Sequence, residues 1–157
     1  MTALITELST KLRDRNLKLA TAESCTGGLI AAALTDLAGS SDIFDRGFVT
    51  YSNDAKIDML GVSRETITSF GAVSAETADE MVSGALANSL ANIAVSVTGI
   101  AGPSGGSDDK PVGLVYIGIG KKGGINNIYR HVFAGDRNAV RQQAKDMALT
   151  YVLKQIS

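Results

Sequence analysis

The stretch LKLATAESCTGGLIAAAL, residues 17–34, joins two apolar segments through a polar turn. Residues 17–22 carry the short apolar pattern of a buried strand. Residues 29–37 are rich in alanine and leucine and stop before Gly39, which predicts a helix buried over much of its surface. Strand, turn and helix in this order form the repeating unit of α/β proteins. Core packing alone does not explain the polar turn, so we interpret it as a functional segment.

The same alternation of strands and helices continues along the chain. Residues 47–52 and 92–98 predict two further buried strands, and residues 112–120 and 125–134 predict a hairpin joined by the turn KKGG. Helices are expected at residues 3–15, 53–61 and 63–71, after Ser74 and from Asp136 onward.

This order of elements predicts the architecture. We expect one domain over residues 1–157, a three-layer α/β/α sandwich around a mixed sheet that is mainly parallel with one antiparallel strand. In such a sheet, ligands bind at the strand ends.

The composition excludes several classes of protein. The 157 residues are 45% hydrophobic with a net charge of -1, so no broad basic surface is available for nucleic acid or an anionic membrane. The longest apolar run is too short to span a membrane, and the amino terminus lacks the pattern of a signal peptide. One cysteine and one histidine exclude a disulfide framework and the usual zinc clusters. We therefore expect a cytoplasmic protein without metal or cofactor.

Ser24 is the first candidate catalytic residue. It lies where a predicted strand passes into a helix, so unpaired helix amides near Thr26, Gly27 and Gly28 could form an oxyanion hole. The alternative is that Ser24 or Thr26 only caps the helix. Cys25 is a rival nucleophile, but lone cysteines at strand ends are more often small buried apolar residues, so we favour Ser24.

Lys56 is the candidate base. The single histidine, His131, lies inside a predicted strand with no acid placed beside it by local spacing. Lys56 lies one helical turn past a strand end among apolar residues, where desolvation could lower its pKa enough for it to act as a base. The alternative is a solvated helix residue. Tyr51 could hydrogen-bond to this lysine or to the serine hydroxyl, although tyrosines in the core are commoner.

Two further segments could bind an anion. The loop of residues 98–107 is rich in glycine, and its amides could bind a phosphate or a carboxamide, although no P-loop pattern fits. GIGKKG, residues 118–123, lies between strands and is therefore not a dinucleotide fingerprint. Arg137 and Arg141 lie one turn apart at the amino-terminal end of the last helix, where a bound anion would relieve their repulsion. Pairing with Asp136 or another carboxylate is the alternative.

Five segments, taken together, resemble one known family. They are AESCTGG at 22–28, GFVTYSNDAK at 47–56, GAVS at 71–74, TGIAGPSGGSDDKPVG at 98–113 and GDRNAVR at 135–141. The chain resembles, over nearly its whole length, the carboxy-terminal domain of the CinA family, the bacterial nicotinamide mononucleotide deamidases. The resemblance implies the three-layer fold, a free-standing form without the larger domain that some members carry, and self-association as a homodimer or higher oligomer.

The resemblance also implies an activity and roles for residues. The family hydrolyses the carboxamide of nicotinamide mononucleotide to nicotinate mononucleotide and ammonia, in pyridine nucleotide salvage, with a serine and a lysine that match Ser24 and Lys56. It implies supporting roles for Tyr51 and Thr98. It further implies phosphate or ribose contacts from the glycine loop, including Gly99 and Gly102, and from Arg137 and Arg141. The turn at Thr26, Gly27 and Gly28 is expected to contact the substrate through its amides, as argued for Ser24. A nucleotide-binding regulator without turnover, or an amidohydrolase of another phosphorylated amide, are the alternatives.

Overall fold

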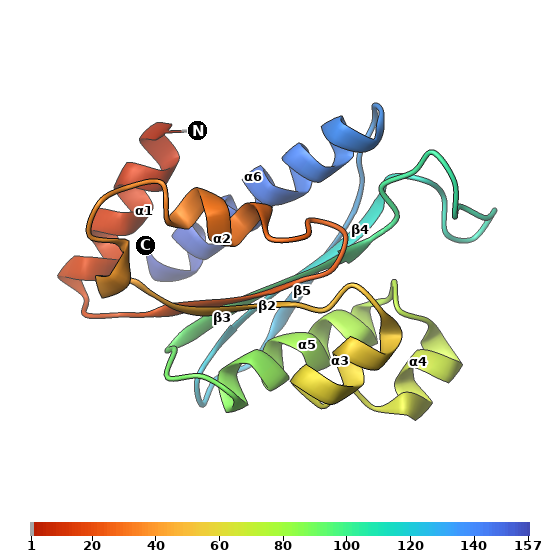
Figure 1. Cartoon of the computed structure of the whole chain (residues 1–157), viewed down its shortest axis with the longest axis horizontal. Helices are drawn as coiled ribbons and strands as arrows, with labels where there is room; N and C mark the ends of the chain where they lie inside the picture. The colour runs from red at the N-terminus through yellow and green to blue at the C-terminus, as the bar shows by residue number, and fades with distance from the viewer. Residues whose placement is uncertain (1) are drawn as a thin grey trace.

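The computed structural model describes residues 2–157 as a central sheet with helices on both faces (Figure 1). The helices are α1 (Thr2–Asp14), α2 (Leu29–Leu34), α3 (Asn53–Leu60), α4 (Arg64–Phe70), α5 (Ala75–Ala87) and α6 (Arg137–Ile156), with a 3-10 turn at Ser40–Asp42. The strands are β1 (Leu19–Glu23), β2 (Phe44–Val49), β3 (Ile93–Gly99), β4 (Leu114–Lys121) and β5 (Asn127–Val132).

The sheet has the strand order β2-β1-β3-β4-β5. β1 pairs in parallel with both β2 and β3, whereas β4 pairs antiparallel with β3 and with β5. Only β4 therefore runs against the other four strands. This confirms the predicted mixed sheet with one antiparallel strand, and it brings the carboxyl ends of β1, β2 and β3 to the same edge.

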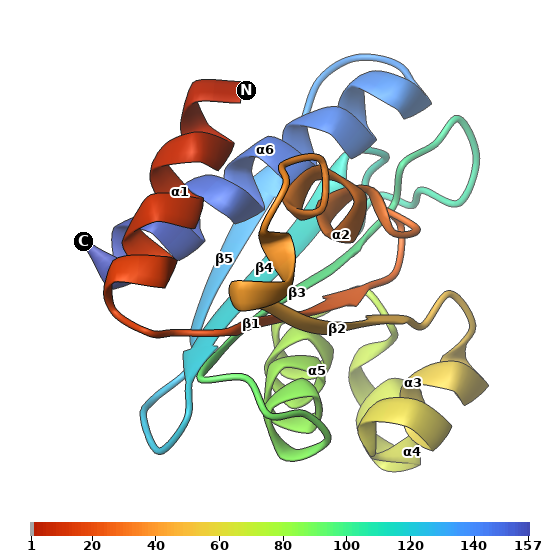
Figure 2. The same ribbon diagram turned by 60° about the vertical axis from the view of Figure 1, so that its left-hand side comes forward.

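The helices form one layer on each face of the sheet. Helices α1, α2 and α6 cover one face and α3, α4 and α5 cover the other (Figures 1 and 2). Alternate residues of a strand point to opposite faces, so Leu19 joins the core under α1 and α6 while the next residue, Ala20, joins the core over α5. Both are fully buried. The three-layer prediction is therefore confirmed.

One close helix contact positions α3 against α5. Gly84 of α5 lies against the carbonyl group of Leu60, and a Cβ atom at position 84 would collide with that backbone. Because backbone cannot move aside as a flexible side chain can, a glycine is required here. The contact fixes the carboxyl-terminal end of α3, the helix that contains Lys56.

The second strand differs from its sequence prediction. β2 begins at Phe44 and ends at Val49, whereas the sequence predicted residues 47–52. Its first residues pair with Leu19 and Ala20 of β1, but Asp45 and Arg46 mask the strand pattern because β2 is an edge strand with part of its surface in water. The last residues of the predicted segment lead instead into α3, where Ser52 caps the helix by accepting a hydrogen bond from the Ala55 amide.

Candidate active site

A cavity of about 270 Å³ opens at the shared carboxyl edge of β1, β2 and β3. The segments that follow the three strands contribute to the wall, as do the last two residues of β3 and the first residue of α6. The lining of the cavity includes Ser24, Cys25, Tyr51, Lys56, Thr98, Gly99, Gly102 and Arg137. The position agrees with the expectation that ligands of α/β sheets bind at strand ends.

Ser24 and Lys56 meet at the inner end of this cavity. Lys56 Nζ lies 2.9 Å from Ser24 Oγ, 2.7 Å from the carbonyl oxygen of Thr50 and 3.5 Å from that of Tyr51. Lys56 is only 1% exposed and Ser24 is 8% exposed. The two residues come from neighbouring parallel strands, since Ser24 follows β1 and Lys56 lies in the first turn of α3, after β2. The sheet therefore brings together two groups that are 32 residues apart in sequence.

The surroundings of this pair make the Lys56 amine easier to deprotonate. Burial lowers the pKa of Lys56 from 10.5 to about 8, because a charged ammonium loses its hydration there. No carboxylate within residues 2–157 forms an ion pair with it to oppose that effect. A neutral amine has two hydrogens and one lone pair. The two carbonyl groups can accept the hydrogens, which leaves the lone pair for the Ser24 hydroxyl.

Cys25, the rival nucleophile, has the opposite character. Its side chain is 6% exposed and belongs to the hydrophobic core beneath α2 and α6. Burial raises the pKa of its thiol to about 11, so the reactive thiolate is scarce near neutral pH. The structure therefore agrees with the interpretation of Cys25 as a small buried apolar residue.

The amides of the turn after Ser24 are only partly available. The Gly27 amide donates to the Ser24 carbonyl at 3.0 Å, so the structure contradicts the expectation that it is unpaired. Further along, the amides of Ile30 and Ala31 donate to the carboxylate of Glu23. Neither Cys25 nor Thr26 has a backbone acceptor for its amide within residues 2–157.

Gly28 and Thr26 complete the turn without reaching the cavity. Gly28 has a φ of 106°, a left-handed conformation that glycine adopts without strain, and it precedes α2. The Thr26 hydroxyl is buried without a hydrogen-bond partner among the described residues. The serine and threonine side chains do not cap α2, so the capping alternative is not seen.

Tyr51 and Thr98 line the cavity but contact other partners than expected. The Tyr51 side chain is 60% exposed, and its hydroxyl accepts a hydrogen bond from Arg137 at 2.9 Å. Only its backbone carbonyl approaches Lys56, so the predicted side-chain bond to the lysine or the serine hydroxyl is not formed. The reason is that β2 ends at Val49, two residues before Tyr51, and the Tyr51 ring is directed toward solvent. The Thr98 hydroxyl donates to the carbonyl of Ala72 at 2.8 Å, which ties β3 to the segment before α5.

The two arginines diverge. Arg137 lines the cavity and donates to the Gly102 carbonyl at 2.9 Å. Arg141 does not line it: its guanidinium donates to the carbonyl groups of Cys25 and Thr26, at 3.0 and 3.2 Å. Neither forms an ion pair within the part of the chain described, so the carboxylate alternative is not seen. Of the two arginines, only Arg137 lies in the cavity wall, beside the glycine loop.

Other ionisable groups lie apart from this cavity. His131 Nε2 lies 2.7 Å from the Tyr151 hydroxyl, between β5 and α6, and burial lowers its pKa. Residues 2–157 contain no group of three or more His, Cys, Asp and Glu side chains arranged to hold a metal. All helices in the same range are too short or too polar to pass through a bilayer.

Sequence reasoning missed the role of Glu23. Its side chain is 0% exposed at the end of β1, and the turn motif drew attention to the hydroxyls instead. A carboxylate at the end of a buried strand, seven residues before a helix amide, is the signal that could have identified it, because buried carboxylates require hydrogen-bond donors.

Comparison with known proteins places this geometry in a family. The family model described as the CinA C-terminal domain matches residues 1–156. The nicotinamide-nucleotide amidohydrolase PncC of Enterobacter agglomerans is 51% identical over 152 residues, which cover 97% of this chain and 93% of that protein. The protein of the same name from Escherichia coli K12 is 51% identical over 92% of this chain and 87% of its own length.

Longer relatives and solved structures agree. A protein of Caldicellulosiruptor saccharolyticus is 52% identical over 92% of this chain, which spans only 35% of that longer protein. The crystal structure of the competence/damage inducible protein CihA from Agrobacterium tumefaciens superposes with a TM-score of 0.97 at 49% identity, covering 99% of this chain and 94% of that one. The chain belongs to the CinA C-terminal domain family.

Proposed function

We propose that this protein hydrolyses the carboxamide of nicotinamide mononucleotide to nicotinate mononucleotide and ammonia. The observation that carries the proposal is the buried 2.9 Å contact between Lys56 Nζ and Ser24 Oγ. The choice of substrate is supported by the two PncC relatives, whose names describe nicotinamide-nucleotide amidohydrolases.

The chemistry follows from the two side chains. Neutral Lys56 accepts the proton of the Ser24 hydroxyl as Ser24 Oγ attacks the carboxamide carbon. The resulting ammonium donates its proton to the departing amine, and ammonia leaves. A water molecule, deprotonated by the same amine, then cleaves the acyl ester and regenerates Ser24. The amide of Cys25, which lacks a backbone acceptor and belongs to a residue that lines the cavity, is the candidate donor to the developing oxyanion.

The charge of the cavity suits an anionic substrate. Its lining contains two basic side chains, Lys56 and Arg137, and no carboxylate. Arg137 and the amides of the glycine loop, around Gly99 and Gly102, form the part of the wall where a phosphate or ribose would bind. Thr98 supports the site by donating a hydrogen bond to the Ala72 carbonyl. Tyr51 supports it by accepting a hydrogen bond that orients the Arg137 guanidinium.

Ammonia release from nicotinamide mononucleotide tests the proposal. Ser24→Ala and Lys56→Ala should each lower kcat by about 10⁴-fold or more, because they remove the nucleophile or its base. Lys122→Ala, which changes an exposed lysine in the turn between β4 and β5, is the matched control and should retain full activity. Equal rates in all four proteins would contradict the proposal. Binding of the mononucleotide by wild type without any product would favour the regulator instead.

A panel of amides and an Arg137 variant test the substrate. Nicotinamide riboside, nicotinamide and glutamine lack the phosphate and should be poorer substrates than the mononucleotide. Arg137→Ala should raise KM for the mononucleotide more than it lowers kcat, because the phosphate contact exists in both ground and transition states. A defect confined to kcat would contradict a phosphate-binding role for Arg137.

A further inference from the structure

Two charged side chains hold the segment that carries the nucleophile, here called the nucleophile turn (residues 24–28). Glu23 lies directly before it and is fully buried. Its Oε1 accepts from the Ile30 amide at 2.9 Å and its Oε2 accepts from the Ala31 amide at 3.1 Å. These are donors of the first turn of α2, which otherwise lack partners. One end of the nucleophile turn is thereby tied to the helix that follows it.

Arg141 holds the middle of the same turn from the opposite direction. It lies near the amino-terminal end of α6, where a positive charge is unfavourable beside the helix dipole. Its Nε and Nη2 donate to the carbonyl groups of Cys25 and Thr26, more than 100 residues earlier in the chain. The contact is close, because a Cβ atom on Gly27 would lie 3.4 Å from Nη2. Arg141 does not line the cavity, so its guanidinium interacts with backbone carbonyl groups and not with the cavity.

The geometry of the peptide bond transmits this contact to the amides. In a trans peptide the carbonyl and the next amide point in opposite directions. Holding the Cys25 carbonyl on Arg141 therefore directs the Thr26 amide away from α6. Holding the Thr26 carbonyl likewise directs the Gly27 amide, which donates to the Ser24 carbonyl at 3.0 Å. That bond in turn fixes the direction of the Cys25 amide.

We propose that Glu23 and Arg141 are positioning residues, which fix the nucleophile turn so that Ser24 is aimed at the reacting carbon and the amide of Cys25 at the oxygen bonded to that carbon. The proposal rests on the amidohydrolase function given above. It replaces the expectation from sequence that Arg141 binds substrate. The two roles predict different kinetics, since a positioning residue acts in the transition state and a phosphate ligand also acts in the ground state.

Steady-state kinetics with nicotinamide mononucleotide separate these roles. Arg141→Gln should lower kcat by about 100-fold, comparable to loss of an oxyanion donor, with KM changed less than about threefold. Arg141→Lys keeps a charge but loses the paired geometry, and should fall between wild type and Arg141→Gln. Glu23→Gln, which retains one acceptor oxygen, should lower kcat by about tenfold. A rise in KM at unchanged kcat for Arg141→Gln would overturn the proposal.

Controls distinguish positioning from simple stabilisation. Arg130→Gln and Glu65→Gln change exposed residues of the same types and should match wild type. Thermal unfolding of each variant shows whether it is folded at the assay temperature. A purely structural role would lower the melting temperature and leave kcat per folded molecule unchanged, which would overturn the proposal.

A second readout does not depend on nicotinamide mononucleotide. Diisopropyl fluorophosphate is an uncharged reagent: Ser24 Oγ forms a bond to phosphorus, fluoride leaves, and Lys56 takes the hydroxyl proton. Its rate of labelling Ser24 should fall in Arg141→Gln by a factor similar to the fall in kcat. If wild type is labelled but does not hydrolyse the mononucleotide, the proposed substrate fails while the labelling still tests positioning. Equal labelling rates for wild type and Arg141→Gln would overturn the positioning role of Arg141.

Discussion

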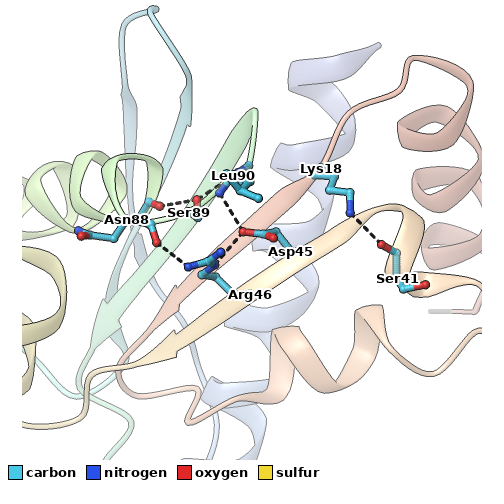
Figure 3. A network of polar contacts seen from close by, with 9 residues as sticks. Lys18, Ser41, Asp45, Arg46, Asn88, Ser89 and Leu90 are labelled. Carbon is cyan, nitrogen blue, oxygen red and sulfur yellow. Dashed lines mark hydrogen bonds and ion pairs between the residues drawn. The ribbon is translucent and has the colours of Figure 1, made fainter.

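Polar clusters lie at both ends of the parallel strands, and they contain similar groups in different surroundings. At the amino ends, Asp45 of β2 accepts from the Arg46 guanidinium at 2.8 Å and from the Leu90 amide at 2.9 Å, and Arg46 also donates to the Asn88 carbonyl (Figure 3). The Arg46 side chain is 48% exposed. At the carboxyl ends, Lys56 is 1% exposed, with a hydroxyl and carbonyls but no carboxylate as partners.

The difference shows what gives a lysine chemical reactivity in this fold. At the amino ends, the Leu90 amide and then the Arg46 guanidinium lower the pKa of Asp45, so the pair stays charged and joins β2 to the loop between α5 and β3. At the carboxyl ends, burial without a counter-ion lowers the pKa of Lys56 to about 8, so the amine loses its proton at a much lower pH than an ordinary lysine does. A basic side chain therefore stays charged and forms a structural link where water and a carboxylate are present, as at Arg46. It can act as a base where water and a carboxylate are both absent, as at Lys56.

Exchanging lysine and arginine at the two ends should give the largest contrast. Lys56→Arg keeps a cation, but a guanidinium cannot release its proton in a protein, so kcat/KM should fall by at least about 10⁴-fold. Arg46→Lys should stay within about twofold of wild type. Ammonia release measures both, and thermal unfolding verifies that the larger side chain at position 56 is accommodated. A folded Lys56→Arg variant with a tenth of wild-type activity would contradict the assignment of Lys56 as the base.

The pH dependence of stability should identify the buried amine. Between pH 8 and 10.5 the unfolded chain keeps the Lys56 proton and the folded protein has lost it, so rising pH favours the folded state. The free energy of unfolding of wild type, relative to Lys56→Met, should rise by on the order of 3 kcal/mol across this window.

Urea denaturation of both proteins at several pH values measures this difference. The subtraction removes other groups that titrate in the same range, such as Cys25, whose raised pKa acts with the opposite sign. A difference between the two proteins that stays constant from pH 8 to 10.5 would show that Lys56 titrates alike in the folded and unfolded chain.

Activity should follow the same ionisation. Because only neutral Lys56 accepts a proton, kcat/KM should rise with pH and level off above about 8, with the value at pH 7 about one tenth of the plateau. Asp45→Ala should show the same profile, since its cluster lies at the other end of the sheet. A wild-type profile that is flat from pH 6.5 to 9 would remove Lys56 as the base.

The smallest effect is expected at the amino-end cluster. Asp45→Ala should lower the free energy of unfolding by about 1 kcal/mol or less at pH 7, because its partners are partly exposed. The folded-state pKa of Asp45 is lowered, so this contribution is present above its ordinary pKa of 3.8 and disappears as pH falls below that value. Denaturation at pH 7 and pH 3 checks both statements. A loss as large as that caused by a core substitution would contradict the description of this cluster as a surface link.

The approach of Ser24 and Lys56 could be expected from sequence, because each follows a strand of the parallel sheet and parallel strands share one edge. The caps of α5 and α6 were also predictable, since Ser74 and Asp136 accept hydrogen bonds from residues three positions later. These contacts are local or follow from strand order.

The partners of Arg141, Glu23 and Tyr51 could not be derived in this way. Arg141 contacts carbonyl groups over 110 residues away, and carbonyls carry no residue-specific signal in a sequence. The like-charged spacing of Arg137 and Arg141 indicated a shared anion. One turn of α6, about 6 Å along its axis, instead places Arg137 at Gly102 and Arg141 at Cys25. The direction of the Tyr51 ring likewise depends on where β2 ends.

The pKa of Lys56 in the folded protein tests the central claim most directly. Lysine labelled with ¹³C at Cε gives a resonance that moves when the amine loses its proton, and Lys56→Met assigns that resonance by its disappearance. The account predicts a midpoint of about 8, well below the other lysines. A midpoint near 10.5, the ordinary value, would show that burial does not ease the loss of the proton, and it would contradict the role of Lys56 as the base.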